Sequence, residues 1–335
     1  MACNANRNIF RNAAKSALAA ACLLAVLSPG LASAQAYPNK TIKILVPFTA
    51  GGSSDIIARA IALKIPDSIP GASVIVENRP GANGAIAAEM TAKAPADGYT
   101  LLVGSIGVFA INPALYRNLP YQTLRDFDLI TVAVRTPNLL VANSKFPATT
   151  LAELIAYSKK NPGKVSFASS GTGSSDHLSA EMFWQKSGTS GIHVPYKGGS
   201  AAMTDLIGGS ADVSFQNLGA VSGHVKGGRL KAIAVTSAQR VSQFPDVPTM
   251  VEAGMAGFEV YSWQAVVAPK GVPKDVLAKL QSAIVAALNA PDNRQRLSDI
   301  GFDVVANSQE QFTEFLKAEL ARWKQVVDTG NVTAE

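Results

Sequence analysis

Runs of apolar and β-branched residues alternate along the chain with stretches whose apolar residues recur at helical spacing. Strands are predicted over 41–46, 72–77 and 99–103, and later over 164–168, 192–196, 211–215, 230–236 and 258–268. Helices are predicted over 56–65 (ended by Pro66), 85–93, 151–160, 178–186 and 201–207. This order is typical of parallel strand–helix–strand units with helices on both faces of a sheet.

The second half of the chain ends in helical patterns over 274–288, 292–300 and 309–327. In the last of these, the apolar residues that share one face are expected in the core: Phe312, Phe315, Leu316, Leu320 and Trp323. Two further strand-like runs, 127–134 and 138–142, are separated by Arg135-Thr136-Pro137.

The N-terminus has the pattern of a signal peptide over residues 1–34. A basic stretch (Arg7, Arg11, Lys15) precedes an apolar run over 17–27, and helix-breaking Ser28-Pro29-Gly30 follows. Ala32-Ser33-Ala34 fits a cleavage site after Ala34, and cleavage after Ala36 fits the same rule. The alternative is an uncleaved anchor, but the apolar run is short for a permanent membrane span.

Composition indicates a globular, exported protein. Hydrophobic residues make up 47% and charged residues 16% of 335 residues, which excludes a disordered chain. The net charge of +6 falls to +3 without the first 34 residues, which carry three basic and no acidic residues. That charge is too small and dispersed for nucleic-acid binding. Cys3 and Cys22 both fall in the presumed signal, so no disulfide or cysteine metal site is expected, although Cys22 leaves lipidation open as an alternative.

The segment 47–55, Pro-Phe-Thr-Ala-Gly-Gly-Ser-Ser-Asp, organises the rest of the prediction. It joins a buried strand to a helix through a glycine turn, so the first backbone N–H groups of the helix point out unpaired. Such N–H groups bind anions. The alternative is that Gly51 and Gly52 only reverse the chain while Ser53 or Ser54 caps the helix.

A second segment, 169–177, repeats this arrangement after another predicted strand. Gly52-Ser53-Ser54-Asp55 and Gly173-Ser174-Ser175-Asp176 align without gaps, which favours two anion seats over two ordinary turns. Turns after parallel strands meet at one edge of the sheet, where ligands of open α/β folds bind. This adds two weaker candidates, Asn83 and Ser105, for which ordinary turn chemistry is the alternative.

Motifs of catalysis and metal binding are missing from the sequence. The three histidines, His177, His193 and His224, have no spacing suited to a metal, and neither a Gly-x-Ser-x-Gly elbow nor a phosphate-binding loop is present. The remaining enzyme hypothesis is an exported serine hydrolase that pairs Ser174 or Ser170 with His177 and Asp176. We predict no catalytic residue, no metal and no cofactor.

Several motifs in order give the chain a family resemblance. They are the signal peptide, Tyr37-Pro38-Asn39-Lys40, Pro47-Phe48-x-x-Gly51-Gly52-x-x-Asp55, Asn78-Arg79-Pro80-Gly81-Ala82-x-Gly84, Asp97-Gly98-Tyr99-Thr100, Ser170-Gly171-x-Gly173-Ser174-x-x-His177, Val194-Pro195-Tyr196-Lys197-Gly198 and Phe244-Pro245-Asp246-Val247-Pro248-Thr249. With them the chain closely resembles the Bug-type substrate-binding proteins of tripartite tricarboxylate transporters, over its whole length after the signal.

The resemblance implies an α/β, two-lobed periplasmic binding protein, each lobe a mostly parallel sheet flanked by helices, with two crossover strands as the hinge. The crossings are expected near Thr136 and Val260. Lobe 1 then comprises residues 37–136 and 260–335, and lobe 2 residues 137–259.

The resemblance also implies a ligand site. The ligand-binding residues carried over are Phe48, Ala50, Gly51, Gly52, Ser53 and Ser54 from one lobe, and Ser169, Ser170, Gly171, Thr172, Gly173, Ser174 and His177 from the other, with Tyr196, Gln216 and Asn217 as weaker candidates.

The implied function is capture of a small organic carboxylate by a periplasmic monomer, which delivers it to the membrane subunits of a tripartite transporter. The ligand shifts the population toward a closed form, because only that form completes both sets of contacts. A ligand sensor with the same clamp is the alternative.

Overall fold

The computed structural model describes residues 37–330, 332 and 333. Contacts divide the chain into Met1–Asn39 and Lys40–Glu335. Only residues 37–39 of the first unit are described, so the predicted signal peptide lies outside the described residues. The second unit contains all the elements below.

The first group of strands is parallel, as predicted. β1 (Ile42–Val46) pairs with β2 (Val74–Asn78) on one side and β3 (Thr100–Ser105) on the other. The connections are α2 (Ser53–Ser68), and the short helix η1 (Ala82–Gly84) followed by α3 (Ala85–Ala92). Three short helices follow β3: η2 (Gly107–Ile111), α4 (Asn112–Leu115) and α5 (Thr123–Asp126).

The second group of strands is built in the same way. β5 (Ser166–Ser169) pairs in parallel with β6 (Ile192–Pro195) and β7 (Val213–Asn217). The remaining elements of this group are α6 (Leu151–Lys160), α7 (Ser175–Ser187), α8 (Gly199–Gly208), α9 (Leu218–Lys226) and β8 (Leu230–Val235).

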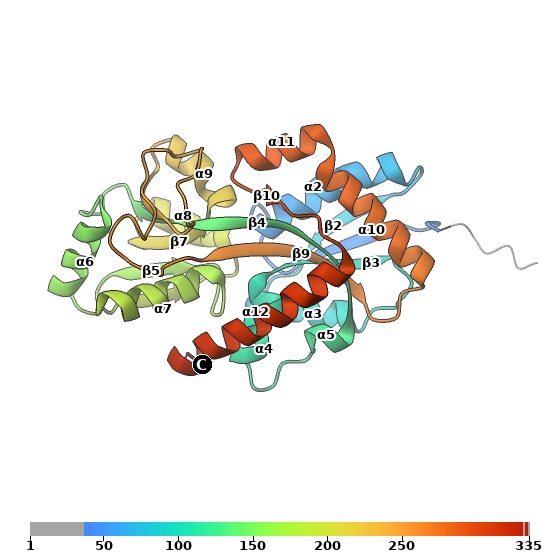
Figure 1. The fold of residues 1–335 in the computed structure, drawn as a ribbon, viewed down its shortest axis with the longest axis horizontal. Coiled ribbons are helices and arrows are strands. Elements are labelled where there is room, and N and C mark those ends of the chain that lie inside the picture. The colour runs from blue at the N-terminus through green and yellow to red at the C-terminus, as the bar shows by residue number, and fades with distance from the viewer. Residues whose placement is uncertain (1–36, 331, 334–335) are drawn as a thin grey trace, which may run out of the picture. The chain divides into compact units, whose positions relative to one another are not determined.

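Two antiparallel strands connect the groups. β4 (Phe127–Asn143) pairs with β9 (Tyr261–Pro269) from Phe127 to Pro137, and then with β7 and β8 from Asn138 onward. β9 also pairs with β3, so the strand order is β2-β1-β3-β9-β4-β7-β5-β6. Figure 1 shows β4 and β9 running through the middle of the unit, between the two groups of helices.

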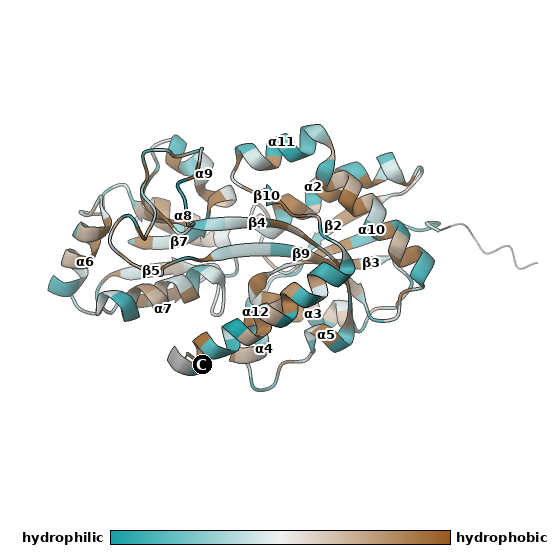
Figure 2. Cartoon of the chain, viewed as in Figure 1, coloured by the Kyte–Doolittle hydropathy of each residue, from teal (hydrophilic) through white to brown (hydrophobic). Residues whose placement is uncertain are grey.

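The C-terminal segment returns to the first group. α10 (Lys274–Asn289) packs against α2, and after α11 (Pro291–Asp299) the short β10 (Asp303–Val304) pairs with β4. α12 (Gln309–Gly330) shows hydrophobic and hydrophilic residues along its length in Figure 2. Phe312, Leu316 and Trp323 are fully buried as predicted, whereas Phe315 is 37% exposed and contacts the ring of Trp263.

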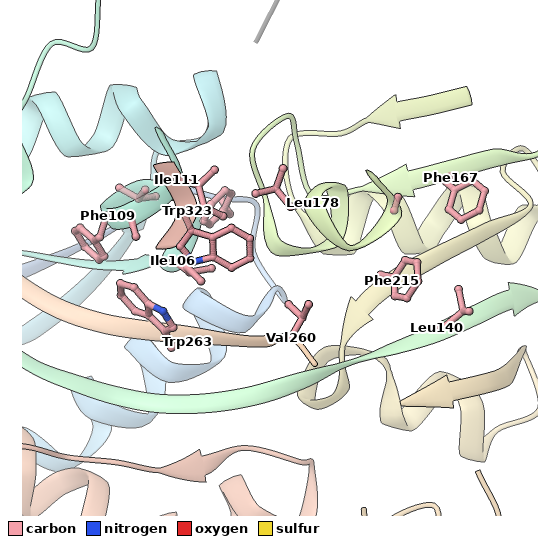
Figure 3. Close-up of a cluster of buried hydrophobic side chains, with 14 of the residues drawn as sticks. Ile106, Phe109, Ile111, Leu140, Phe167, Leu178, Phe215, Val260, Trp263 and Trp323 are labelled. Atoms are coloured by element: carbon pink, nitrogen blue, oxygen red, sulfur yellow. The ribbon is translucent and has the colours of Figure 1, made fainter. Parts of the chain in front are cut away.

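The largest apolar cluster continues through both groups of strands. Phe109 stacks on Trp263 with ring centroids 6.2 Å apart, and Phe215 stacks on Phe258 at 5.6 Å. Figure 3 shows Trp263 and Trp323 at one end of this cluster and Phe167 and Phe215 at the other. Within residues 37–330, 332 and 333, no helix combines the length and the apolar composition that a membrane span needs.

Two local predictions were wrong, and one helix was not predicted. Pro66 does not end its helix, which continues to Ser68. Pro66 lies in the last turn of α2, where its missing N–H removes only one hydrogen bond of the helix. Arg135-Thr136-Pro137 does not separate two strands, because Pro137 lies where β4 exchanges one partner for others. Helix α9 was not predicted, because Gly219, Gly223 and the closing glycines weaken its helical pattern.

Candidate functional site

A polar cavity of about 40 Å³ lies where loops from both groups of strands meet. Nine predicted site residues line it: Phe48, Gly52, Ser53, Ser54, Ser105, Ser170, Ser174, Gln216 and Asn217. The two glycine loops of the sequence, 47–55 after β1 and 169–177 after β5, therefore lie on the wall of one cavity.

The loop after β1 is closed by Asp55. Gly51 adopts a left-handed φ of +81°, Gly52 is the extended N-cap of α2, and the Gly51 N–H donates to Asp55 Oδ2 at 2.9 Å. Arg59 Nε donates to the same oxygen at 2.9 Å and Asn78 Nδ2 to Oδ1 at 3.0 Å. The carboxylate is thus used within the loop, which leaves the first N–H groups of α2 directed at the cavity.

Burial alone would raise the pKa of Asp55. The hydrogen bonds from Arg59, the Gly51 N–H and Asn78 outweigh it and hold the pKa below its usual value. Asp55 is therefore a charged fixture of the loop at neutral pH.

The loop after β5 has the same backbone but a different closing residue. Gly173 has a φ of +83°, and Ser174 is the extended N-cap of α7, whose hydroxyl accepts from the His177 N–H at 3.3 Å. The Gly173 N–H donates to His177 Nδ1 at 3.1 Å.

These contacts correct the alignment of the two loops by one residue. Gly52 and Ser174 are both N-caps, so Asp55 corresponds to His177, and each accepts from a glycine N–H four residues earlier. Asp176 then corresponds to Ser54, and both line the cavity. The alignment of the two Ser-Ser-Asp sequences was wrong by one residue. In the first loop this sequence begins at the first residue of α2, whereas in the second it begins at the N-cap of α7.

Asp176 is a buried carboxyl group on the cavity wall. Its Oδ2 accepts from the Ser170 N–H and the Ser170 hydroxyl, both at 2.6 Å, and from Gln216 Nε2 at 3.2 Å. Burial is the main influence on its pKa and raises it above the usual value.

His177 lies behind the loop and outside the cavity lining. Its ring stacks on His193 with centroids 3.8 Å apart, and its Nε2 lies 3.5 Å from Glu181 Oε1. His193 Nε2 lies 2.6 Å from Ser169 Oγ, and burial, with His177 beside it, lowers the pKa of His193 to about 3. Because the Ser174 hydroxyl meets the backbone N–H of His177 and not its ring, these residues do not form the Ser–His pair that a hydrolase requires.

Two sets of contacts join the two groups of strands near the cavity. On one side Thr49 Oγ1 lies 2.9 Å from Ser200 Oγ, Ser200 Oγ donates to the Ala50 carbonyl at 2.8 Å, and the Thr49 N–H donates to the Lys197 carbonyl at 3.3 Å. A Cβ on Gly198 would lie 2.7 Å from Thr49 Oγ1.

On the other side the amide of Asn83 reaches the loop after β5. A Cβ on Gly171 would lie 3.4 Å from Asn83 Oδ1, and one on Gly173 would lie 3.0 Å from Asn83 Nδ2. Asn83 itself is held by a hydrogen bond from its Nδ2 to Asn112 Oδ1, 2.9 Å long.

Nine other predicted residues do not line the cavity. Asn83 and Ala50 form the contacts just described, and Tyr196 donates its hydroxyl to Asp205 Oδ2 at 2.7 Å, where burial and this bond raise its pKa to about 12. The full set is Ala50, Gly51, Asn83, Ser169, Gly171, Thr172, Gly173, His177 and Tyr196.

Six lining residues were not among the predicted ones: Ser175, Asp176, Gly199, Ala220, Ser262 and Gln264. Two of them, Ser262 and Gln264, come from β9, far along the chain from both loops. The signal that could have found them is their alternation with Trp263 and Ala265, which are buried in the core.

The cavity is suited to an anion held by neutral donors. Among the described residues that line it, none is Lys, Arg or His, and only Phe48 and Ala220 have apolar side chains. Helix N-termini and serine hydroxyls are the available donors. Within the part of the chain that the structure describes, no three His, Cys, Asp or Glu side chains are grouped so as to hold a metal ion.

Comparison with known proteins agrees with this geometry. The family described as "Tripartite tricarboxylate transporter family receptor" (TctC) matches residues 57–332. Protein BugT of Bordetella pertussis is 38% identical over 300 residues, which cover 89% of this chain and 92% of BugT.

Solved structures give the same result. Rpa4515 of R. palustris with adipate is 35% identical with a TM-score of 0.86, covering 89% of this chain and 99% of that one. MatC (Rpa3494) of Rhodopseudomonas palustris with bound malate is 32% identical with a TM-score of 0.83, covering 87% and 100%. The predicted α/β, two-lobed fold and the predicted family are thereby confirmed. The chain belongs to the receptor family of tripartite tricarboxylate transporters, as a Bug-type solute-binding protein.

Proposed function

We propose that this protein binds a small organic carboxylate in the cavity between its two lobes and closes over it. The observation that carries the proposal is the meeting of two helix N-termini, those of α2 and α7, at one cavity whose described lining contains no basic side chain. Backbone N–H groups and serine hydroxyls bind a carboxylate in such a place without a counter-charge.

The size of the cavity favours a short acid. A volume of about 40 Å³ corresponds to roughly three water molecules on the scale where ~10–15 Å³ holds one. The relatives solved with adipate and malate contain dicarboxylates, which supports a carboxylate as the ligand.

The lobes that we propose are residues 37–136 with 260–335, and residues 137–259. The change of partners in β4 at Pro137 and Asn138, and the start of β9 at Tyr261, support these boundaries. The contacts of Thr49 with Ser200 then belong to the closed form, which bound ligand stabilises.

Delivery to the membrane subunits of a tripartite transporter, from the periplasm and as a monomer, completes the proposal. Family membership supports this role. The chain acts as a receptor and not as an enzyme, in line with the missing Ser–His pair at Ser174. Ser53, Ser54, Ser170 and Ser174 are the side chains that we propose for the carboxylate, with Phe48, Gly52 and Asn217 beside them.

A thermal-shift panel followed by calorimetry tests the function. It covers mono-, di- and tricarboxylates, aromatic acids and amino acids, with the neutral amide of each acid as the matched control. We expect at least one acid to raise the melting temperature while its amide does not, because ligand at 100 times its Kd stabilises by about 2.7 kcal/mol. If no acid in the panel shifts the melting temperature, the binding function is wrong.

A further inference from the structure

Gln264 forms the floor of the cavity together with two serines. Ser105 on β3 pairs with Gln264 on β9, and Ser262 lies two residues earlier on the same face of β9. All three line the cavity, and the middle of β9 has hydrophilic colours in Figure 2.

The position of Gln264 is fixed by its neighbour. Trp263 points to the opposite face, where it stacks on Phe109 and donates from Nε1 to Glu319 Oε2 at 2.8 Å (Figure 3). Gln264 itself is 1% exposed. A side chain held in this way is preorganised for a ligand.

A series of hydrogen-bonded side-chain amides orients the amide group of Gln264. Gln264 Nε2 donates to Asn217 Oδ1 at 3.4 Å, Asn217 Nδ2 donates to Asn138 Oδ1 at 2.6 Å, and Asn138 Nδ2 donates to Ser179 Oγ at 3.1 Å. The amide nitrogen of Gln264 is thus used within the protein.

The other end of the same amide has no partner. Gln264 Oε1 is buried and has no hydrogen-bond partner among the described residues. A buried acceptor left without a donor is unfavourable, so a ligand that supplies the donor binds more tightly than one that does not. The carboxyl group of Asp176 on the wall adds a further acceptor to the same cavity.

We propose that Gln264 selects, among small carboxylates, those that also present an O–H or N–H donor to the floor of the cavity. This inference rests on the proposed function. The carboxylate is held at the helix N-termini, and a hydroxyl or ammonium group of the same ligand donates to Gln264 Oε1. The ligand class is therefore a short hydroxy acid or amino acid, not a plain acid.

Matched ligands test the selection by calorimetry. The probes are propionate, lactate and alanine, and succinate, malate and aspartate, in which hydrogen, hydroxyl and ammonium replace one another; pyruvate serves as an acceptor-only control. We expect the better donor-bearing member of one series to bind the wild type at least ~10-fold more tightly than its unsubstituted acid. The member that binds more tightly, the hydroxy acid or the amino acid, shows whether the donor is a hydroxyl or an ammonium group.

Variants assign the selection to Gln264. Gln264→Met keeps the length and removes the acceptor, so the preference should fall to within about 3-fold. Gln295→Met, on the exposed surface of α11, should match the wild type. Gln264→Glu keeps an acceptor, so the preference should persist while every carboxylate binds more weakly through charge repulsion.

The inference is overturned by equal binding within both series, by tighter binding of pyruvate than of lactate, or by a preference unchanged in Gln264→Met. The result for Gln264→Met counts when its ligand-free melting temperature equals that of the wild type. If Gln264→Met does not fold, the test passes to Gln264→Glu, and loss of the preference in that variant overturns the inference. If only the unsubstituted acids bind, the selection by Gln264 is wrong but the proposed carboxylate-binding function stands. If no acid in the wider thermal-shift panel binds, the proposed function itself is wrong. Binding of larger acids without any of these six also rejects the short donor-bearing ligand.

Discussion

The loops after β1 and β5 hold their glycine turns with an acceptor four residues further along, but the two acceptors differ in charge. Asp55 accepts from the Gly51 N–H and also pairs with Arg59, whereas His177 accepts from the Gly173 N–H and lies against His193. Similar backbones are therefore closed by an ion pair in one lobe and by an imidazole in the other.

The difference extends to the cavity wall. The first loop presents Ser54 where the second presents Asp176, a carboxyl group surrounded by the neutral donors Ser170 and Gln216. The hydrogen bonds around Asp55 stabilise its charged form and lower its pKa, whereas burial disfavours the charged form of Asp176 and raises its pKa. The same residue type therefore stabilises the first loop as a charged group, whereas in the second loop burial disfavours its charge.

The largest effect should come from Asp55→Asn. The variant removes the ion pair with Arg59 and replaces one acceptor by a donor, so we expect a loss of about 1.5–3 kcal/mol of unfolding free energy at neutral pH. Because the folded pKa is lowered, this stabilisation is present above the unfolded pKa of about 3.9 and is lost as the pH falls through the folded pKa.

Urea unfolding of wild type and variant at pH 7, 4 and 3 measures this difference. The gap should narrow toward the acid end. Asp67→Asn, which removes an exposed pair with Lys64, is the matched control and should change stability by less than about 1 kcal/mol. A gap that stays constant with pH would show that Asp55 acts only as a spacer.

Gly198→Ala should have the next largest effect, and on ligand binding. The loop after β1 is contacted across the cavity by Gly198, whose φ of +138° and 2.7 Å approach of an added Cβ to Thr49 Oγ1 exclude a side chain in the closed form. In the closed form the added Cβ must displace Thr49, and overpacking of this kind costs about 1–3 kcal/mol, so affinity should fall roughly 10-fold.

The control for Gly198→Ala is Gly163→Ala. Gly163 has a φ of +66° with nothing within 4 Å of an added Cβ, so it carries a backbone cost without a contact across the cavity. Calorimetry with an acid from the panel should show normal affinity for this control. Equal losses in both variants would mean that the contact with Thr49 is not part of closure.

Local patterns predicted most of the elements. The strands at Ile42–Val46 and Ser166–Ser169 and the helices Leu151–Lys160 and Lys274–Asn289 were confirmed within a few residues, because their signals are contained in their own segments. The antiparallel pairing of β9 with β3 and β4 was not predicted, since it joins segments more than a hundred residues apart.

The site was predicted where the helix N-termini determine it. Gly52, Ser53 and Ser174 line the cavity because they lie at the starts of α2 and α7, and Ser170 lines it because it directly follows β5. Gln264 could not be reached by that reasoning, because its place depends on pairing between β3 and β9. The one-residue error between the loops arose because glycine and serine both suit an N-cap.

The smallest effect, and the sharpest test of the comparison, should come from Asp176→Asn. Asn keeps one acceptor for the Ser170 N–H and removes a charge that burial disfavours, so stability at neutral pH should change by less than about 1 kcal/mol. Because the folded pKa is raised, the stability that Asp176 contributes is complete below the unfolded pKa of about 3.9 and is lost as the pH rises through the folded pKa. The stability of the variant relative to wild type should therefore increase from pH 4 to pH 7, opposite in sign to Asp55→Asn. Urea unfolding at the same three pH values decides this, and a loss at pH 7 as large as that of Asp55→Asn would mean that the two carboxylates do the same work.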